Sequence, residues 1–144
     1  MNMKIYLASS LQDSRRKEAK DALEILQSKG HDVYFPLDHK IHNAWDYPNP
    51  EWGLMVFQSD LSAIQACDVV VVLSHGREES TAGVDWEAGF AFGIGKKVII
   101  VEMTDLPMSL MVANGRYATV KGLYGLLSYD WENMPPSRTD TEQK

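Results

Sequence analysis

Two uninterrupted runs of branched apolar residues constrain the fold more than any other feature of the sequence. They are "VVVVL" within residues 68–74 and "VIIV" within residues 97–103. Strands with one solvent-exposed face alternate apolar and polar residues, whereas strands covered by helices on both faces are apolar throughout. We therefore expect both runs to be central strands of a parallel sheet.

The segments around these runs alternate between strand and helix patterns. The expected strands are residues 3–8, 31–36, 68–74, 97–103 and 117–120. The expected helices are residues 13–28, 51–67, 84–95 and 121–127, with a short helix or turn at 106–115. This order predicts a single α/β domain over residues 1–134, followed by a polar C-terminal tail at 135–144. The domain should be a doubly wound, five-stranded parallel sheet of flavodoxin-like type, with helices on both faces.

Charge and cysteine content exclude several classes of protein. The 144 residues carry a net charge of −6 and no run of Lys or Arg, which argues against nucleic acid as a partner. Cys67 is the single cysteine, so an internal disulfide is impossible and a reducing compartment is expected. The N-terminus shows no signal peptide and no apolar run is long enough to cross a bilayer. We expect a cytoplasmic protein without a membrane partner.

Polar and aromatic residues follow the predicted strands, where parallel α/β sheets bind their ligands. Ser9 comes between the first strand and a helix N-terminus, so it could contact a phosphate or sugar hydroxyl, or only cap the helix. Asp38 and Trp45 lie in the long loop after the second strand, and Asp60 interrupts the apolar pattern of the next helix. Each carboxylate is a ligand candidate or an ordinary solvated group. Trp45 could stack on a planar base or pack the loop.

Glu87 is a carboxylate in a predicted helix whose other residues are mainly small, apolar or aromatic and therefore suited to burial. The helix dipole favours an acid near a helix start by about 0.3–1 kcal/mol, which would be a purely structural reason. However, Phe90, Ala91 and Ile94 follow at helical spacing, so Glu87 shares an apolar face. It also follows a loop containing Gly83, a candidate substrate-binding residue, at a predicted carboxyl edge. A carboxylate in a partly dry pocket suits covalent attack or stabilisation of an oxocarbenium ion.

Four segments resemble the nucleoside 2-deoxyribosyltransferase family in order and spacing. They are "KIYLASS", "SDLSAIQACDVVVVL", "STAGVDWEAGFAFGIGKKVIIV" and "SLMVANG". The block D-L-x-x-I-x-x-x-D followed by G-x-x-W-E-x-G-x-A carries the resemblance, which covers nearly the whole chain except the tail.

The resemblance implies an enzyme that moves 2-deoxyribose between nucleobases with retention, without metal or cofactor. Glu87 matches the nucleophile that forms a covalent deoxyribosyl-enzyme, and Asp60 matches an aspartate that assists proton traffic with the base. Tyr6 matches a tyrosine that hydrogen-bonds the nucleophile. Ala8 and Ser9 would lie beside the ribose.

Two further positions depart from the family pattern. The family carries an aspartate near the base where this chain has Thr81, and Asp85 is the candidate substitute. In the family, a neighbouring subunit donates a segment that matches "SLMVANG", which implies that Ser109 and Met111 would reach the 5′ end of the sugar. The family often has asparagine at the first of these positions. Serine resembles instead the related deoxynucleoside 5′-monophosphate N-glycosidases.

The expected partners are deoxynucleosides, free nucleobases and further copies of the chain. Shared sites imply at least dimer units, and the family is often hexameric. Two alternatives stay open: a hydrolase of deoxynucleoside 5′-monophosphates that uses the same residues, and a catalytically silent nucleotide sensor on the same fold.

Overall fold

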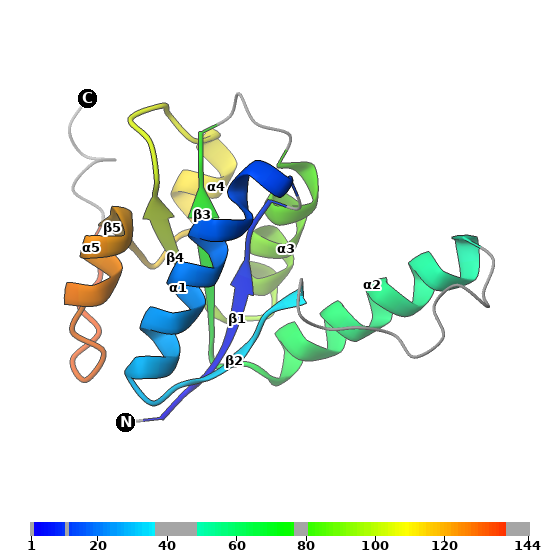
Figure 1. The fold of residues 1–144 in the computed structure, drawn as a ribbon, viewed down its shortest axis with the longest axis horizontal. Helices are drawn as coiled ribbons and strands as arrows, with labels where there is room; N and C mark the ends of the chain where they lie inside the picture. Colours follow the sequence, from blue (N-terminus) through cyan, green and yellow to red (C-terminus); the bar gives the residue numbers. More distant parts are fainter. Residues whose placement is uncertain (1, 11, 37–48, 77–80, 138–144) are drawn as a thin grey trace.

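The described residues form five strands that run parallel in one sheet, in the order β2-β1-β3-β4-β5. The computed structural model describes residues 2–10, 12–36, 49–76 and 81–137. The strands are β1 (Lys4–Ala8), β2 (Asp32–Tyr34), β3 (Val69–Ser74), β4 (Lys97–Glu102) and β5 (Ala118–Lys121). The predicted flavodoxin-like topology is confirmed, with β3 at the centre and β1 and β4 beside it (Figure 1).

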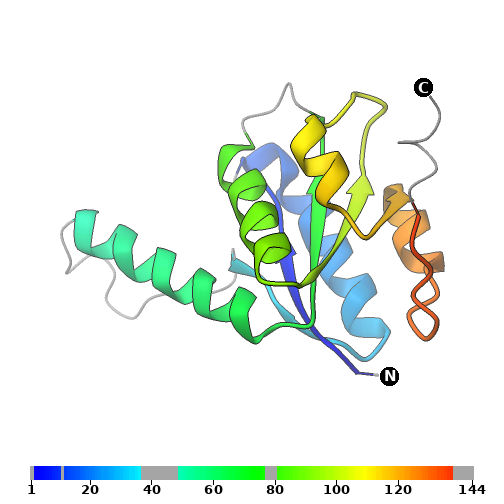
Figure 2. The same cartoon turned by 180° about the vertical axis from the view of Figure 1, so that it is seen from behind.

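Helices cover both faces of this sheet. They are α1 (Arg16–Ser28), α2 (Asn49–Ala66), α3 (Ala82–Gly93), α4 (Leu110–Gly115) and α5 (Gly122–Ser128), with a 3₁₀ turn (Asp13–Arg15) leading into α1. Side chains of α1 and α5 pack in one apolar cluster, and side chains of α2, α3 and α4 pack in the other. Figures 1 and 2 show these two layers from opposite sides.

The central strands are buried on both faces, as their apolar runs predict. In β3, Val69, Val71 and Leu73 face the α1 side. Val70 and Val72 face the α3 side. The two cores are therefore built from alternate residues of the same strands.

Helix boundaries differ from the predicted ones by a few residues. The helix expected from residue 51 starts at Asn49, because Pro50 already has the backbone dihedral of a first helical turn. The helix expected from residue 84 starts at Ala82. The helix expected from residue 13 begins with the tighter 3₁₀ turn. The middle of each element was predicted correctly.

Helix α2 projects away from the body of the molecule (Figures 1 and 2). Among its residues, all of which the structure describes, Ile64 alone is buried. Trp52, Leu54 and Phe57 are 42%, 54% and 47% exposed. In the part of the chain that the structure describes, the N-terminal half of α2 therefore presents an exposed apolar surface.

The opposite end of the sheet is closed by α5 and the residues after it. Tyr117 Oη donates to the carbonyl of Met134 at 2.6 Å, and Tyr129 Oη donates to the carbonyl of Pro135 at 3.0 Å.

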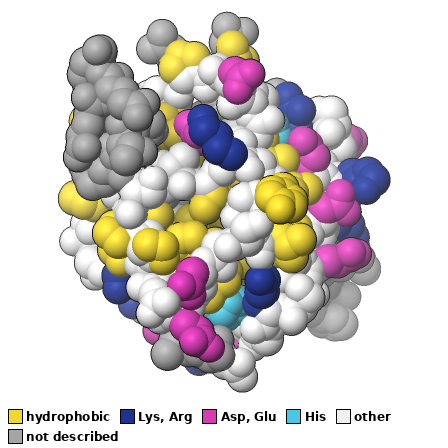
Figure 3. Space-filling model, turned by 90° about the vertical axis from the view of Figure 1, so that its left-hand side faces the viewer, with side chains coloured by type: hydrophobic (Ala, Val, Ile, Leu, Met, Phe, Trp, Pro, Cys, Tyr) yellow, Lys and Arg dark blue, Asp and Glu magenta, His cyan; other side chains and the backbone are white. Residues whose placement is uncertain are grey.

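On the side of the molecule seen in Figure 3, Lys and Arg side chains lie among Asp and Glu. No helix in the described residues is long and apolar enough to cross a membrane.

Candidate active site

Tyr6 and Glu87 form the closest polar contact of the candidate site. Tyr6 lies in the middle of β1 and is fully buried, while Glu87 lies on the second turn of α3. The Tyr6 hydroxyl donates to Glu87 Oε2 at 2.5 Å. A carboxylate so held has a fixed orientation, as a nucleophile requires.

The surroundings of Glu87 set its charge. Burial raises the pKa of Glu87 to about 7, the hydrogen bond from Tyr6 lowers it, and the nearby charge of Asp60 raises it. Burial and the negative charge of Glu87 also raise the pKa of Tyr6 far above its ordinary value, so Tyr6 stays a donor. Glu87 is therefore poised between its neutral and charged forms near neutral pH.

Asp60 is held by a tyrosine that the sequence analysis did not single out. Tyr34, in β2, directs its hydroxyl to Asp60 Oδ1 at 3.3 Å. The Tyr34 ring stacks on the Tyr6 ring, with centroids 5.5 Å apart and planes 13° from parallel. Burial and the charge of Asp60 raise the pKa of Tyr34 to about 12.

Glu87 and Asp60 open onto a common cavity of about 570 Å³ at the carboxyl ends of β1 and β3. Its lining residues are Ser9, Ser10, Gln12, Pro36, Asp60, Thr81, Ala82, Gly83, Val84 and Glu87. The two carboxylates also line a more apolar hollow of about 500 Å³ between α2 and α3, beside Phe57 and Trp86. The carboxylates thus lie where a cavity lined by Ser9, Ser10 and Gln12 meets a more apolar hollow, which suits a ligand with a sugar and a base.

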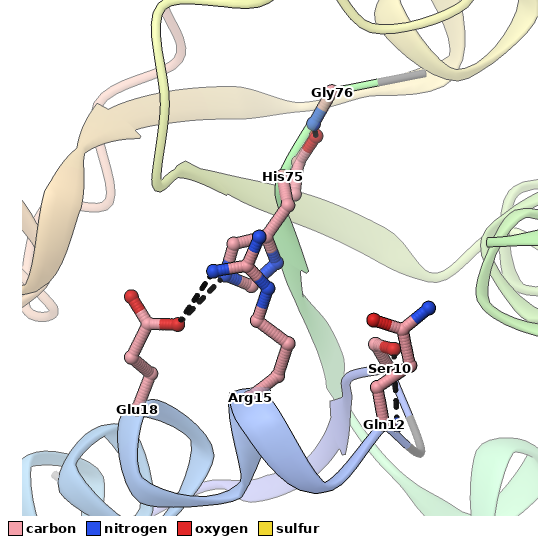
Figure 4. A network of polar contacts seen from close by, with 7 residues as sticks. Ser10, Gln12, Arg15, Glu18, His75 and Gly76 are labelled. Carbon is pink, nitrogen blue, oxygen red and sulfur yellow. Dashed lines mark hydrogen bonds and ion pairs between the residues drawn. The ribbon is translucent and has the colours of Figure 1, made fainter. Parts of the chain in front are cut away.

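A polar network fixes the two loops that border the cavity (Figure 4). His75 follows β3, is buried, and places Nε2 3.0 Å from Glu18 Oε1 on α1. Arg15 Nη1 lies 3.5 Å from the same oxygen. Ser10 Oγ accepts a hydrogen bond from the Gln12 amide at 3.2 Å. The sequence analysis did not foresee this network, because Glu18 and His75 are far apart in the chain.

The predicted site residues fall into four groups. Ser9 and Gly83 line the cavity with Glu87 and Asp60. Ala8 is buried in the same apolar cluster as Tyr6. Asp38 and Trp45 lie outside the described residues.

The fourth group faces away from the Glu87 of its own chain. Asp85, Ser109 and Met111 line a separate cavity of about 430 Å³ between α3 and α4. Asp85 is two residues before Glu87, which puts it on nearly the opposite side of the helix. Its carboxylate accepts a hydrogen bond from the Thr81 hydroxyl at 3.0 Å. The structure therefore does not bring Asp85 into the cavity of its own Glu87.

Ser109 and Met111 sit at the start of α4. Ser109 Oγ caps this helix by accepting a hydrogen bond from the Val112 amide at 3.3 Å. Met111 is 85% exposed. Within the described ranges, the structure holds no cluster of three or more His, Cys, Asp or Glu residues that could bind a metal ion.

Comparison with known proteins identifies the family. The chain belongs to the nucleoside 2-deoxyribosyltransferase family, whose model matches residues 5–124. No curated protein sequence matches the chain.

Two solved structures are similar to it. The 2-deoxyribosyltransferase of Bacillus psychrosaccharolyticus has a TM-score of 0.82 at 26% identity, covering 93% of this chain and 97% of its own. The CMP N-glycosidase BcmB of Clostridium botulinum has a TM-score of 0.59 at 22% identity, covering 86% of this chain and 93% of its own. The second likeness shows a shared fold. Activity on nucleosides by glycosyl transfer or N-glycoside cleavage follows from the family.

Proposed function

We propose that the protein is a nucleoside 2-deoxyribosyltransferase that exchanges the base of 2′-deoxyribonucleosides. The observation that carries the proposal is the Tyr6–Glu87 hydrogen bond at a cavity that also contains Asp60. A half-buried, oriented carboxylate beside a second carboxyl group is the arrangement that retaining glycosidic chemistry needs.

The reaction proceeds in two balanced half-reactions. The Glu87 carboxylate attacks the anomeric carbon, the bond from that carbon to the base nitrogen breaks, and Asp60 in its acid form gives its proton to the departing base. In the second half, the incoming base attacks the anomeric carbon as the bond from that carbon to Glu87 breaks, and the base returns a proton to Asp60. Two inversions give overall retention.

The cavity and the adjoining hollow suit the sugar and the base of a nucleoside, respectively. Ser9, Ser10 and Gln12 offer polar groups to the sugar, while the hollow beside Phe57 and Trp86 offers aromatic faces to the base. A 2′-hydroxyl would crowd Glu87, which favours deoxyribose. Purine and pyrimidine deoxynucleosides are both candidate substrates.

The protein should act as a homo-oligomer that shares its sites. Met111 on α4 and the aromatic residues Trp52, Phe57 and Trp86 are exposed. Phe57 and Trp86 are in contact, with ring centroids 5.5 Å apart. Exposed apolar surface of this kind is typical of an interface. In this arrangement Ser109 and Met111 of one subunit reach the 5′ end of the sugar in the next, although they face away from Glu87 in their own.

Subunit mixing tests this arrangement. Glu87→Gln and Met111→Glu each remove activity, because each spoils every site of a homo-oligomer. Mixing the two variants under conditions that allow subunit exchange should restore activity, since some sites then combine an intact Glu87 with an intact Met111. No recovery after verified exchange would show that each subunit uses its own residues.

A second candidate is hydrolysis of deoxynucleoside 5′-monophosphates. Ser109 in place of the family's asparagine and the hydroxyl-bearing end of the cavity, Ser9 and Ser10, favour a phosphate. A CMP N-glycosidase also shares the fold. In this reading water replaces the incoming base, while Glu87 and Asp60 keep their roles.

Product analysis distinguishes the candidates. The protein is incubated with 2′-deoxyinosine and adenine, and separately with a deoxynucleoside monophosphate. Deoxyadenosine formed only when adenine is present supports base exchange, whereas free base and deoxyribose 5-phosphate indicate the hydrolase. Glu87→Gln should abolish either activity, while Glu24→Gln, at an exposed position on α1, should not. Ligand binding without turnover, unaffected by Glu87→Gln, would indicate the sensor.

A further inference from the structure

Tyr6 and Tyr34 are direct neighbours across two strands. Strands β1 and β2 pair in parallel, and Tyr6 and Tyr34 are opposite each other in the register. Their side chains therefore leave the same face of the sheet, which explains the stacked rings with centroids 5.5 Å apart. The pair is fixed by the sheet itself.

Each tyrosine reaches a different carboxylate. Tyr6 donates to Glu87 at 2.5 Å, and Tyr34 donates to Asp60 at 3.3 Å. Glu87 lies on α3 and Asp60 on α2, two helices that come from separate parts of the chain. Two neighbouring hydroxyls on one sheet thus set the spacing of two carboxylates on two helices.

The hydrogen bond from a tyrosine hydroxyl matters more for the position of Asp60 than for that of Glu87. It lies one turn before Ile64, which is the buried residue of α2, and the helix beyond it projects from the body of the molecule. The Tyr34 hydroxyl ties Asp60 to the rigid sheet. Because burial, Asp60 and Glu87 all raise the pKa of Tyr34, its hydroxyl stays protonated and available as a donor at physiological pH.

We propose that Tyr34 is a positioning residue that holds Asp60 at the distance and orientation needed for proton transfer to the base. This inference rests on the proposed function. The Tyr34 hydroxyl donates to Asp60 Oδ1 and so restrains the carboxyl group from which the departing base takes its proton. Tyr34 itself is not among the residues that line the cavity of Glu87 and Asp60.

This role makes a specific prediction about leaving groups. A natural purine needs a proton as it departs, so it depends on Asp60. A 4-nitrophenolate leaves as a stable anion and needs no such proton. Loss of the Tyr34 hydroxyl should therefore slow cleavage of a 2′-deoxyribonucleoside much more than cleavage of 4-nitrophenyl 2-deoxyriboside.

The test compares Tyr34→Phe with a matched control. Tyr34→Phe keeps the ring that stacks on Tyr6 and removes one oxygen. Tyr129→Phe removes the same atom from a tyrosine that also hydrogen-bonds within the protein, to the carbonyl of Pro135, away from the cavity. Tyr34→Leu gives a second variant without the ring. Circular dichroism and thermal unfolding check that all variants fold.

Single-turnover cleavage of 2′-deoxyinosine and of the nitrophenyl glycoside is measured for each variant. General acid–base catalysis contributes about 10²–10⁴-fold, so loss of its positioning should cost about 10-fold or more in kcat on the nucleoside, with KM within about twofold. The loss on the nitrophenyl glycoside should be several times smaller. Tyr129→Phe should match the wild type on both substrates, and Tyr34→Leu should lose at least as much as Tyr34→Phe.

A double-mutant cycle separates positioning from a general structural effect. If Tyr34 acts through Asp60, adding Tyr34→Phe to Asp60→Asn should cause little further loss, because the two changes affect one function. Equal losses on both substrates, or losses that simply add in the double variant, would overturn the inference. An inert wild type would count against the proposed function instead.

Discussion

Removing the Tyr6 hydroxyl should move the pH dependence of catalysis to higher pH. Tyr6 donates to Glu87 at 2.5 Å, and this hydrogen bond lowers the pKa of Glu87 against the larger effect of burial, leaving it at about 7. Tyr6→Phe keeps the buried ring and its stacking, so the burial of Glu87 persists while the donor is lost. The neutral form of Glu87 is then favoured, and more alkaline conditions are needed to ionise the nucleophile.

The size of the change follows from the hydrogen bond. A hydrogen bond to a charged group contributes about 1.5–3 kcal/mol, and one pKa unit corresponds to about 1.36 kcal/mol. The pKa of Glu87 should therefore rise by about one to two units. In the wild type, kcat/KM for base exchange should increase with pH around a midpoint near 7 as Glu87 ionises, and it should fall again at the pH where Asp60 loses the proton that the base needs, because kcat/KM reports the free enzyme.

The assay measures kcat/KM between about pH 5 and pH 9.5 for wild type, Tyr6→Phe and Tyr117→Phe. The Tyr117 hydroxyl also donates within the protein, to the carbonyl of Met134, so it is a matched control. The midpoint should move alkaline in Tyr6→Phe alone. A midpoint that stays in place or moves to lower pH would refute the role given to this hydrogen bond.

Three further perturbations test the same account. Because the pKa of Glu87 is raised from 4.5 to about 7 in the fold, the unfolded chain loses this proton first, and stability falls as pH rises from about 4.5 to 7. Chemical unfolding should show Glu87→Gln to be more stable than wild type by up to about 3 kcal/mol at pH 8 and equal to it at pH 4; equal stability at pH 8 would contradict the burial argument. Asp60→Asn should lower kcat on deoxynucleosides by about 10²-fold or more in steady-state assays, and near-normal kcat would remove Asp60 from proton transfer. Gly76→Ala should cost about 1–3 kcal/mol in urea unfolding, since Gly76 has a φ of +80° and a Cβ there would collide with Leu106; an unchanged midpoint would contradict this.

The fold could be predicted from sequence because its information is local. Continuous apolar strands and helical spacing are visible within short windows, and a parallel sheet brings strand ends to one edge. Ser9, Asp60, Gly83 and Glu87 were placed together by that argument and do line one cavity.

Pairing between strands is not local, which is why Tyr34 was missed. A tyrosine in a strand looks like any packing residue, and its partnership with Tyr6 appears only once the register of β1 and β2 is known. Asp85 is a different case. The helical period of 100° per residue places it nearly opposite Glu87, so counting along the helix would have separated the two residues.

The most direct test of the central claim is to trap the sugar on the protein. The wild type is mixed with 2′-deoxyinosine without an acceptor base, quenched in acid, digested and analysed by mass spectrometry. The account predicts a deoxyribosyl adduct on the peptide that contains Glu87, which disappears when adenine is added before the quench. Base exchange by an active enzyme without that adduct, or with an adduct on another residue, would contradict it.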